Sequence, residues 1–300
     1  MPRWCRPNLE LRAGVSLVLV ALLAATGCEK ERSGAASGEG PPGRIVTLTP
    51  SSTELVVALG GLDRLVGVDS YSTEPAPVAA LPRVGDFLAP NLEAIIRLEP
   101  DLVVLDQVQA KVATSLNAAG IRTLTLDMHT LADVRAGMLA VGEALGAEAV
   151  AAAAVAAFDQ AVDDVSRRGQ SRARPRPRVL AVVDRSPGGL RGVVVAGPGS
   201  YIDELLAIIG ADNVMAGSPL RYTTISAEQI ERAAPTDILD SVHGADPVRA
   251  RADWSRLAQI PAVARGRIHQ LADQLFAVPG PRVGEALHQL EQVIYGISPE

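Results

Sequence analysis

Residues 44–68, RIVTLTPSSTELVVALGGLDRLVGV, decide the fold class of this chain. The apolar runs at 45–48 and 65–68 predict buried strands, because short aliphatic and β-branched runs between turn residues are typical of strands inside a sheet. Between the two runs, residues 51–59 predict a helix. A strand, a helix and another strand in this order favour a mostly parallel sheet whose faces are covered by helices.

The same alternation continues on the C-terminal side of this stretch. The patterns predict helices at 92–98 and 108–119 and strands at 102–105 and 121–126. Pro100 ends the first of these helices, because proline lacks the N–H group that a continuing helix needs. Residues 44–146 are therefore interpreted as an N-terminal α/β lobe.

Residues 131–168 differ in composition, since they contain no proline and are rich in alanine. Three glycines weaken the first half of this segment as a helix. From residue 147 to residue 167 the apolar side chains recur at helical spacing, and a helix of about 21 residues is about 31 Å long. We interpret residues 147–169 as one long connecting helix, because the segment 169–177, GQSRARPRP, then breaks the pattern.

Alternation resumes after this break and predicts a C-terminal α/β lobe over residues 170–300. Strands are expected at 179–183, 193–195, 238–242 and 268–271, and helices at 201–209, 226–233 and 282–295. Trp254 precedes apolar residues at helical spacing and is expected in the core. The predicted fold is α/β, with two lobes built on central mostly parallel sheets and joined by one long α-helix.

The N-terminus has the pattern of an export signal. Three arginines among the first 12 residues precede an apolar stretch at 13–26, which is too short to span a membrane comfortably. Residues 25–28, ATGC, resemble a bacterial lipobox, in which the cysteine is acylated and becomes the new N-terminus. We predict a signal peptide at 1–27, lipidation of Cys28 and a flexible tether at 28–43, because EKERSGAASGEGPPG cannot bury a core. The protein is expected to be exported to the cell envelope and anchored to a membrane on its periplasmic or extracytoplasmic face.

The composition excludes several classes of function. Of the 300 residues, 48% are hydrophobic and 21% are charged, which is typical of globular proteins. The net charge is −6 without a long basic run, so nucleic acid is not an expected partner. The cysteines are Cys5 and Cys28, and removal of the signal peptide leaves Cys28 as the single thiol. The mature chain therefore has no disulfide and no cysteine-based metal or catalytic site.

No motif of nucleotide binding or of hydrolysis is present. The sequence has neither a Walker A motif nor a GxGxxG turn after a strand, and GPGS at 197–200 is interpreted as a loop with Ser200 capping the next helix. The four histidines do not lie at the spacings of zinc sites. We expect a monomer that binds a small molecule, without catalysis, metal or cofactor.

Two serines are candidate ligand contacts because of their position after the first strand. Ser51 and Ser52 begin the first predicted helix, and in open α/β sheets the N–H groups of such helices face bound ligands. Ser51 and Glu54 are also spaced as a capping box. A capping role without ligand contact is therefore the alternative for both serines.

Aromatic residues outside the periodic segments are further candidates, because only 3% of the residues are aromatic. Tyr71, Phe87 and Tyr222 lie in polar or proline-rich connections. Aromatic rings on loops suit a wall that stacks on a flat ligand. The alternative is that each ring anchors its own loop in the core.

An internal similarity links the two predicted lobes. Residues 91–100, NLEAIIRLEP, match residues 226–235, SAEQIERAAP, in a glutamate, an isoleucine, an arginine and a proline at the same offsets. Glu93 and Glu228 therefore take equivalent places in the first turns of two helices. An acidic residue there favours the helix dipole by about 0.3–1 kcal/mol. A second interpretation is that each lobe presents one carboxylate to arginines of a membrane transporter.

These motifs together resemble class III periplasmic binding proteins, the substrate-binding subunits of ABC importers for vitamin B12, haem and ferric siderophores. The resemblance covers the chain from about residue 44 onward. The motifs that carry it are RIVTLTPSSTEL at 44–55, LVGV at 65–68, NLE at 91–93, SAEQ at 226–229 and PGPR at 279–282. It implies a ligand held in the cleft between the lobes, with Glu93 and Glu228 docking onto the permease of a permease–ATPase complex.

Among members of this family, vitamin B12 binders are most similar, which implies a corrinoid ligand. Residues 68–75, VDSYSTEP, resemble their cleft tyrosine segment, Phe87 and Tyr222 match cleft aromatic positions, and Asp273 matches a cleft aspartate. Arg221 and Arg282 are expected to supply further polar contacts.

Siderophore binding stays open as an alternative, because Arg185, Arg221 and Arg282 suit an anionic chelate. Haem binding is the other alternative within the family, although GDF at 85–87 lacks the tyrosine that haem-binding members place there. Outside the family, an envelope ligand sensor and an envelope enzyme are the alternatives.

Overall fold

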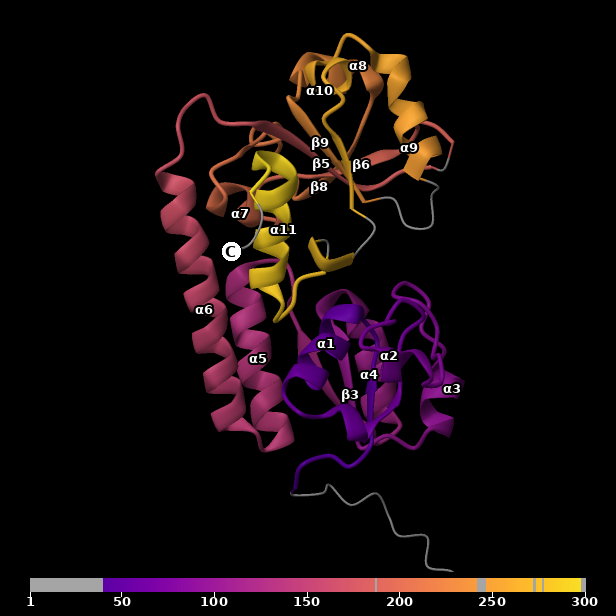
Figure 1. The fold of residues 1–300 in the computed structure, drawn as a ribbon. Coiled ribbons are helices and arrows are strands. Elements are labelled where there is room, and N and C mark those ends of the chain that lie inside the picture. The colour runs from indigo at the N-terminus through magenta and orange to yellow at the C-terminus, as the bar shows by residue number, and fades with distance from the viewer. Residues whose placement is uncertain (1–39, 187, 242–246, 272–273, 277, 298–300) are drawn as a thin grey trace, which may run out of the picture. The chain divides into compact units, whose positions relative to one another are not determined.

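The computed structural model describes residues 40–186, 188–241, 247–271, 274–276 and 278–297. Within these residues the chain forms two α/β lobes in succession (Figure 1). The predicted signal peptide, Cys28 and most of the predicted tether lie outside the described residues, as does Asp273.

The sheet of the N-terminal lobe is parallel throughout, with the strand order β2-β1-β3-β4. Its strands are β1 (Ile45–Thr47), β2 (Leu65–Gly67), β3 (Leu102–Asp106) and β4 (Arg122–Leu126). The helices are α1 (Pro50–Ala58), α2 (Ala76–Ala79), α3 (Leu92–Arg97), α4 (Ala110–Ala118) and α5 (Leu131–Leu145). Every residue of β1 and β3 is buried, because these central strands have neighbours on both sides and covered faces.

The sheet of the C-terminal lobe is mixed, with the order β10-β9-β5-β6-β8 and β7 paired to β5. Its strands are β5 (Arg178–Asp184), β6 (Val193–Ala196), β7 (Asp212–Asn213), β8 (Tyr222–Ile225), β9 (Asp237–Asp240) and β10 (Ile268–Gln270). The helices are α7 (Tyr201–Ile208), α8 (Ala227–Ala233), α9 (Pro247–Trp254), α10 (Pro261–Ala264) and α11 (Val283–Tyr295). β6 runs antiparallel to both β5 and β8, while β5, β9 and β10 are parallel.

One long helix, α6 (Glu148–Gln170), joins the two lobes. It contacts α5 on the N-terminal side and α7 and α11 on the C-terminal side (Figure 1). The contact with α5 is close at Gly142, where an added Cβ would lie 2.3 Å from the Cβ of Ala151. Gly142, one of the glycines that weaken this segment as an isolated helix, therefore allows α5 to approach α6 closely.

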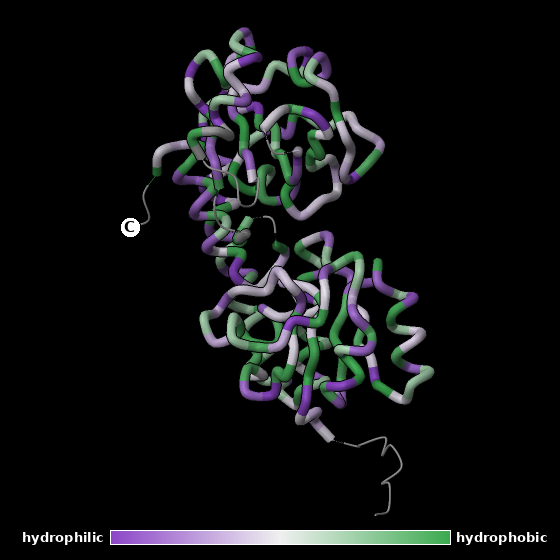
Figure 2. Tube along the Cα trace, turned by 90° about the vertical axis from the view of Figure 1, so that its right-hand side faces the viewer, coloured by the Kyte–Doolittle hydropathy of each residue, from purple (hydrophilic) through white to green (hydrophobic). Residues whose placement is uncertain are grey.

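The hydrophobic residues, green in Figure 2, gather inside the two lobes. One core cluster continues from β1 and α1 through α5 and α6 to α7 and α11. Two smaller clusters cover the opposite faces of the two sheets. Trp254 has no exposed surface and belongs to the C-terminal one of these, which confirms its predicted place in the core.

Two local predictions were wrong. The first helix begins at Pro50, and its capping box joins Thr49 to Ser52 instead of Ser51 to Glu54. The reason is that the fixed φ of proline suits the first helical position, which moves the cap to the preceding threonine.

Tyr222 lies in strand β8, where it pairs with Ala196, and not in a loop. The strand has four residues and lies at the edge of the sheet, so its alternation of polar and apolar residues is too short to be distinguished from a polar loop. The structure also forms the helix α5 in the glycine-containing segment.

Candidate functional site

The loop after β2 carries Tyr71, whose side chain is 50% exposed. Its backbone N–H donates to Oδ2 of Asp69 at 2.8 Å, and the Ser72 hydroxyl donates to Oδ1 of the same carboxylate. Ser72 in turn shares a 2.7 Å hydrogen bond with Thr53 of α1. Asp69 is buried, and this burial raises the pKa of its carboxyl group. A buried hydrogen-bond network therefore holds the backbone on both sides of an exposed tyrosine.

The segment that contains Phe87 is held in place by Gln109. The buried Gln109 amide donates to the Phe87 carbonyl at 2.9 Å and to the Leu48 carbonyl at 3.3 Å. Its Oε1 accepts the backbone N–H of Asp106 at 3.1 Å. One side chain thus ties the ends of β1 and β3 to the Phe87 loop. Phe87 itself is half-buried.

The two serines of the first helix are buried, so little of their surface is accessible to a ligand. Ser51 is 7% exposed and Ser52 is 1% exposed. The Ser52 hydroxyl accepts the backbone N–H of Thr49 at 3.2 Å, which completes the capping box, and it donates to the Thr49 carbonyl at 2.9 Å. These contacts favour the capping interpretation for Ser52.

Tyr222 lies on the other lobe, on the edge strand β8, and is 39% exposed. The neighbouring Arg221 is exposed, and its guanidinium forms no ion pair within the described part of the chain. Its carbonyl accepts the backbone N–H of Gly197 at 2.7 Å, which places this residue beside the loop before α7. Tyr222 is thus presented by the C-terminal lobe, whereas Tyr71 and Phe87 lie on loops of the N-terminal lobe.

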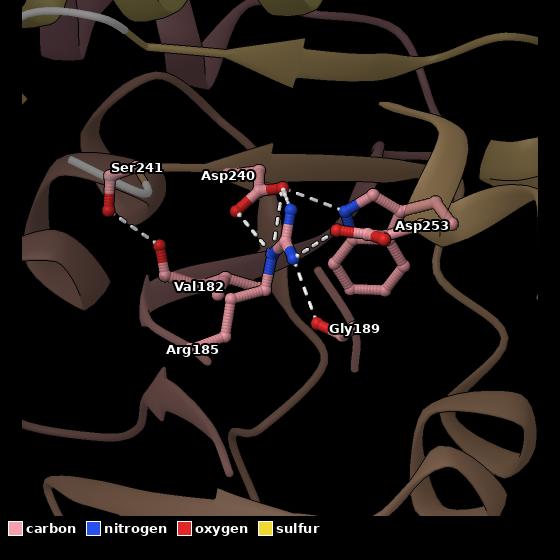
Figure 3. Close-up of polar contacts among 7 residues, drawn as sticks. Val182, Arg185, Gly189, Asp240, Ser241 and Asp253 are labelled. Carbon is pink, nitrogen blue, oxygen red and sulfur yellow. Dashed lines mark hydrogen bonds and ion pairs between the residues drawn. The ribbon is translucent and has the colours of Figure 1, made fainter. Parts of the chain in front are cut away.

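Arg185 is buried in the C-terminal lobe, between the ends of β5 and β9 (Figure 3). Its guanidinium contacts both carboxylate oxygens of Asp240 and lies 2.9 Å from Oδ2 of Asp253. The indole N–H of Trp254 donates to the same Asp240 carboxylate at 2.8 Å. Burial by itself lowers the pKa of Arg185, and the hydrogen bonds to Asp240 and Asp253 more than offset this effect. The predicted ligand contact is thus a buried cation bound by two carboxylates of its own lobe.

Arg282 is also bound by a carboxylate. Its guanidinium lies 3.2 Å (Nε to Oε2) from Glu54 of α1, and a second contact joins Nη2 to Oε1 at 2.5 Å. The Glu54 side chain is 12% exposed and that of Arg282 is 36% exposed. Of the three candidate arginines, two are therefore paired with carboxylates inside the protein.

The two glutamates of the internal similarity occupy equivalent positions. Glu93 is the second residue of α3 and Glu228 is the second residue of α8, and both are exposed. Both helices are followed by a non-glycine residue with positive φ, Glu99 at 46° and Ala234 at 43°, directly before a proline. The similarity of the two sequences thus extends to the backbone conformation.

Comparison with known proteins identifies the family. Residues 45–275 match the family of periplasmic binding proteins. This chain belongs to that family. YvrC of Bacillus subtilis, an uncharacterized ABC transporter substrate-binding lipoprotein, is 30% identical over 262 residues, which cover 85% of this chain and 80% of that protein. The vitamin B12-binding protein of Salmonella paratyphi A is 27% identical over 252 residues, with 82% and 88% covered.

The fold of this periplasmic binding protein is also found in solved structures. A periplasmic heme-binding protein from Pseudomonas aeruginosa superimposes with a TM-score of 0.75 at 29% identity and covers 86% of this chain and 94% of that one. The two-lobe α/β fold with one joining helix is thus confirmed for this family member.

The described part of this periplasmic binding protein contains no group of three or more His, Cys, Asp or Glu residues arranged to hold a metal ion. None of its described helices is both long enough and apolar enough to cross a membrane.

Sequence reasoning missed the residues that support the site, namely Asp69 and Gln109. Both are buried polar residues close to the carboxyl end of a parallel strand. Asp69 directly follows an apolar run, which is the signal that could have found it, whereas Asp106, Gln107 and Val108 separate Gln109 from its run.

Proposed function

We propose that this periplasmic binding protein is the substrate-binding lipoprotein of an ABC importer and captures a corrinoid between its two lobes. Two relatives support the proposal. The Bacillus subtilis protein is named as a substrate-binding lipoprotein of an ABC transporter, and the Salmonella protein is named for vitamin B12 binding. In this proposal Tyr71 and Phe87 contact one side of the ligand and Tyr222 contacts the other.

Arg185 and Arg282 are each paired with carboxylates of the protein, and this favours a corrinoid over an anionic chelate as the ligand. An anionic ligand needs cations whose charge is not already compensated. Asp240 and Asp253 compensate Arg185, and Glu54 compensates Arg282. Arg221 is then the one candidate arginine left for a ligand, so Arg185 and Arg282 are dropped from the proposed contacts. A corrinoid is bound mainly through its large flat faces, which aromatic side chains suit.

Haem is the second candidate, because the Pseudomonas aeruginosa structure is that of a heme-binding protein and is 29% identical. Haem carries two carboxylates and an iron that binds an axial ligand. His129 follows β4, and its Nε2 lies 3.3 Å from Oδ1 of Asp127. A change in the haem absorption spectrum on mixing would identify this function directly.

The test uses the soluble chain from residue 29 to residue 300. Native mass spectrometry and titration calorimetry with cyanocobalamin, cobinamide, haem and ferric siderophores would identify the ligand class. We expect saturable 1:1 binding of a corrinoid, weakened about tenfold or more by Tyr71→Ala, because about 1.4 kcal/mol of lost contact is a factor of ten. Binding of haem alone would replace the corrinoid proposal, and binding of none of these ligands would reject both.

The proposed docking residues Glu93 and Glu228 call for a separate experiment. Each would pair with an arginine of the permease, as a charge-assisted hydrogen bond between an acidic and a basic surface. Replacing both with lysine is expected to abolish uptake of labelled ligand by cells while leaving ligand affinity unchanged. Glu148→Lys is the matched control, because Glu148 is also an exposed glutamate in the first turn of a helix. A loss of affinity in the double variant would contradict the docking role.

Lipid anchoring through Cys28 is part of the same proposal. Burying acyl chains in a membrane is favourable by about 0.8 kcal/mol for each CH₂ group. A Cys28→Ser variant is expected to appear in the soluble fraction of the envelope, whereas the unchanged protein fractionates with membranes. Equal partitioning of both proteins would contradict lipidation.

A further inference from the structure

Two apolar side chains other than the predicted ones are exposed on the loops of the N-terminal lobe. Leu88 is 83% exposed in the loop that also carries Phe87, and Val108 is 60% exposed in the short 3₁₀ helix Gln107–Gln109 after β3. Isolated exposed apolar residues are common on protein surfaces and need no explanation. These two differ because their loops are linked to each other and to the loop of Tyr71.

Hydrogen bonds make these loops one continuous rim. The backbone N–H and the hydroxyl of Ser70, the neighbour of Tyr71, both donate to the Gly85 carbonyl at 2.8 and 3.0 Å. Gln109, the neighbour of Val108, donates to the Phe87 carbonyl at 2.9 Å. We call the exposed side chains Tyr71, Leu88 and Val108 the N-terminal rim.

The backbone beneath the rim is held in place on both sides. Oδ1 of Asp86 accepts the N–H groups of Leu88 and Ala89 at 2.9 and 2.7 Å. Oδ1 of Asp106 accepts the N–H of Val108 at 2.8 Å. Leu88 and Val108 are thus presented to solvent by ordered turns, so a ligand that covers them pays little to order the backbone.

The loops that bear the rim are acidic. Residues 68–91, 106–111 and 127–130 contain the carboxylates of Asp69, Glu74, Asp86, Asp106 and Asp127. The basic residues in the same segments are Arg83, Lys111 and His129. Arg83 is directed to the carbonyls of Asp69, Ser72 and Ala79. A ligand with several negative charges is repelled at such an edge.

We infer that Leu88 and Val108 are ligand contacts for the apolar face of an uncharged or cationic ligand. This inference rests on the proposed binding function. A corrinoid and an uncharged ferric hydroxamate meet the requirement, whereas haem with its two carboxylates and a trianionic ferric catecholate do not. Leu88 and Val108 select by apolar contact and the carboxylates of the surrounding loops select by charge, while the aromatic residues supply the flat surface.

The test compares Leu88→Ser, Val108→Ser and the double variant with the unchanged chain of residues 29–300. The probes are cyanocobalamin, an uncharged ferric trihydroxamate, a ferric tris-catecholate and haem. Each single variant is expected to weaken binding about tenfold and the double variant about a hundredfold, from the apolar area no longer covered. Leu139→Ser is the matched control, because Leu139 is 51% exposed on α5, away from the strand ends. Its dissociation constant is expected to stay within about twofold of the unchanged chain.

The outcomes separate this inference from the proposed function. Corrinoid binding that the double variant weakens supports both. Binding of the uncharged hydroxamate alone, weakened in the same variants, supports the inference and rejects the corrinoid. Binding of haem or the catecholate alone overturns the inference, as does a double variant that binds like Leu139→Ser. Binding of no probe rejects both.

Discussion

Glu54 and Arg282, which are 228 positions apart in the sequence, form a two-contact ion pair between the first helix and the residue that precedes the last one. The backbone of Gly280 lies close to the Glu54 side chain, since a Cβ added at Gly280 would lie 2.8 Å from Oε2 of Glu54. α1 belongs to the N-terminal lobe, and α11 packs on α6 and α7. The pair therefore links the two lobes independently of α6.

Arg282→Met is expected to lower the free energy of unfolding by about 1–3 kcal/mol, because the mostly buried Glu54 carboxylate loses its partner. Glu54→Gln and the double variant complete a cycle in which the double loss is smaller than the sum of the single losses. Urea unfolding measures each value. Glu285→Gln is the control, since Glu285 is 65% exposed and 3.8 Å from Arg282. Additive effects would show that the pair does not couple the lobes.

Substitution of Asp240 is expected to lower the free energy of unfolding more than most single substitutions in the C-terminal lobe. Asp240→Ala leaves the Arg185 guanidinium buried with one carboxylate fewer, and breaking a buried pair in this way costs about 3–5 kcal/mol. Trp254→Phe removes one hydrogen bond to Asp240 and is expected to cost about 1–3 kcal/mol. Urea unfolding followed by circular dichroism measures both. If Asp240→Ala does not fold, Asp240→Asn provides the comparison, and a neutral Asp240→Asn would contradict the argument.

Gly142→Ala is expected to destabilise the protein by about 1–3 kcal/mol, although alanine favours helices over glycine by about 1 kcal/mol. The added methyl group would meet the Cβ of Ala151, which is fixed to the backbone of α6. Gly137→Ala is the control within α5, because its neighbours are the flexible ends of Leu55 and Met128 at 3.1 and 3.2 Å. Thermal unfolding should show a large loss for Gly142→Ala that Ala151→Gly partly restores.

Asp237 is expected to make stability depend on pH. Burial by itself raises the pKa of Asp237, but hydrogen bonds from His269, Arg267 and Thr236 outweigh this effect and hold the pKa below its ordinary value. A carboxylate with a lowered pKa stabilises the fold above its ordinary pKa of about 4, and this contribution is lost as the pH falls through the lowered value.

The matching measurement is urea unfolding of Asp237→Asn between pH 7 and pH 3. The variant should be less stable than the unchanged chain at pH 7, and the difference should shrink in acid. Asp212→Asn serves as the control, because Asp212 is 55% exposed and 3.9 Å from Arg176. A loss for Asp237→Asn that is equal at every pH would contradict the assignment to the carboxylate charge.

The sequence by itself determined the elements whose signals are local. Apolar runs predicted β1 and β3, because a strand inside a sheet is buried on both faces. Helical spacing of apolar residues predicted α6, because one face of that helix packs against the protein. The matching stretches around Glu93 and Glu228 predicted two helices in equivalent places, and both are present with their N-caps at Asn91 and Ser226.

Only the tertiary structure decided which charges are left for a ligand. Nothing near Arg185 or Arg282 in the sequence indicates that either is paired, because their carboxylate partners lie 55 and 228 positions away. Gln109 and Phe87 are joined in the same way across two strand ends. Such contacts depend on the order in which strands assemble into a sheet, and no period within either segment records that order. The sequence therefore determined the elements and the family resemblance, while the packing of the two lobes decided the chemistry of the candidate site.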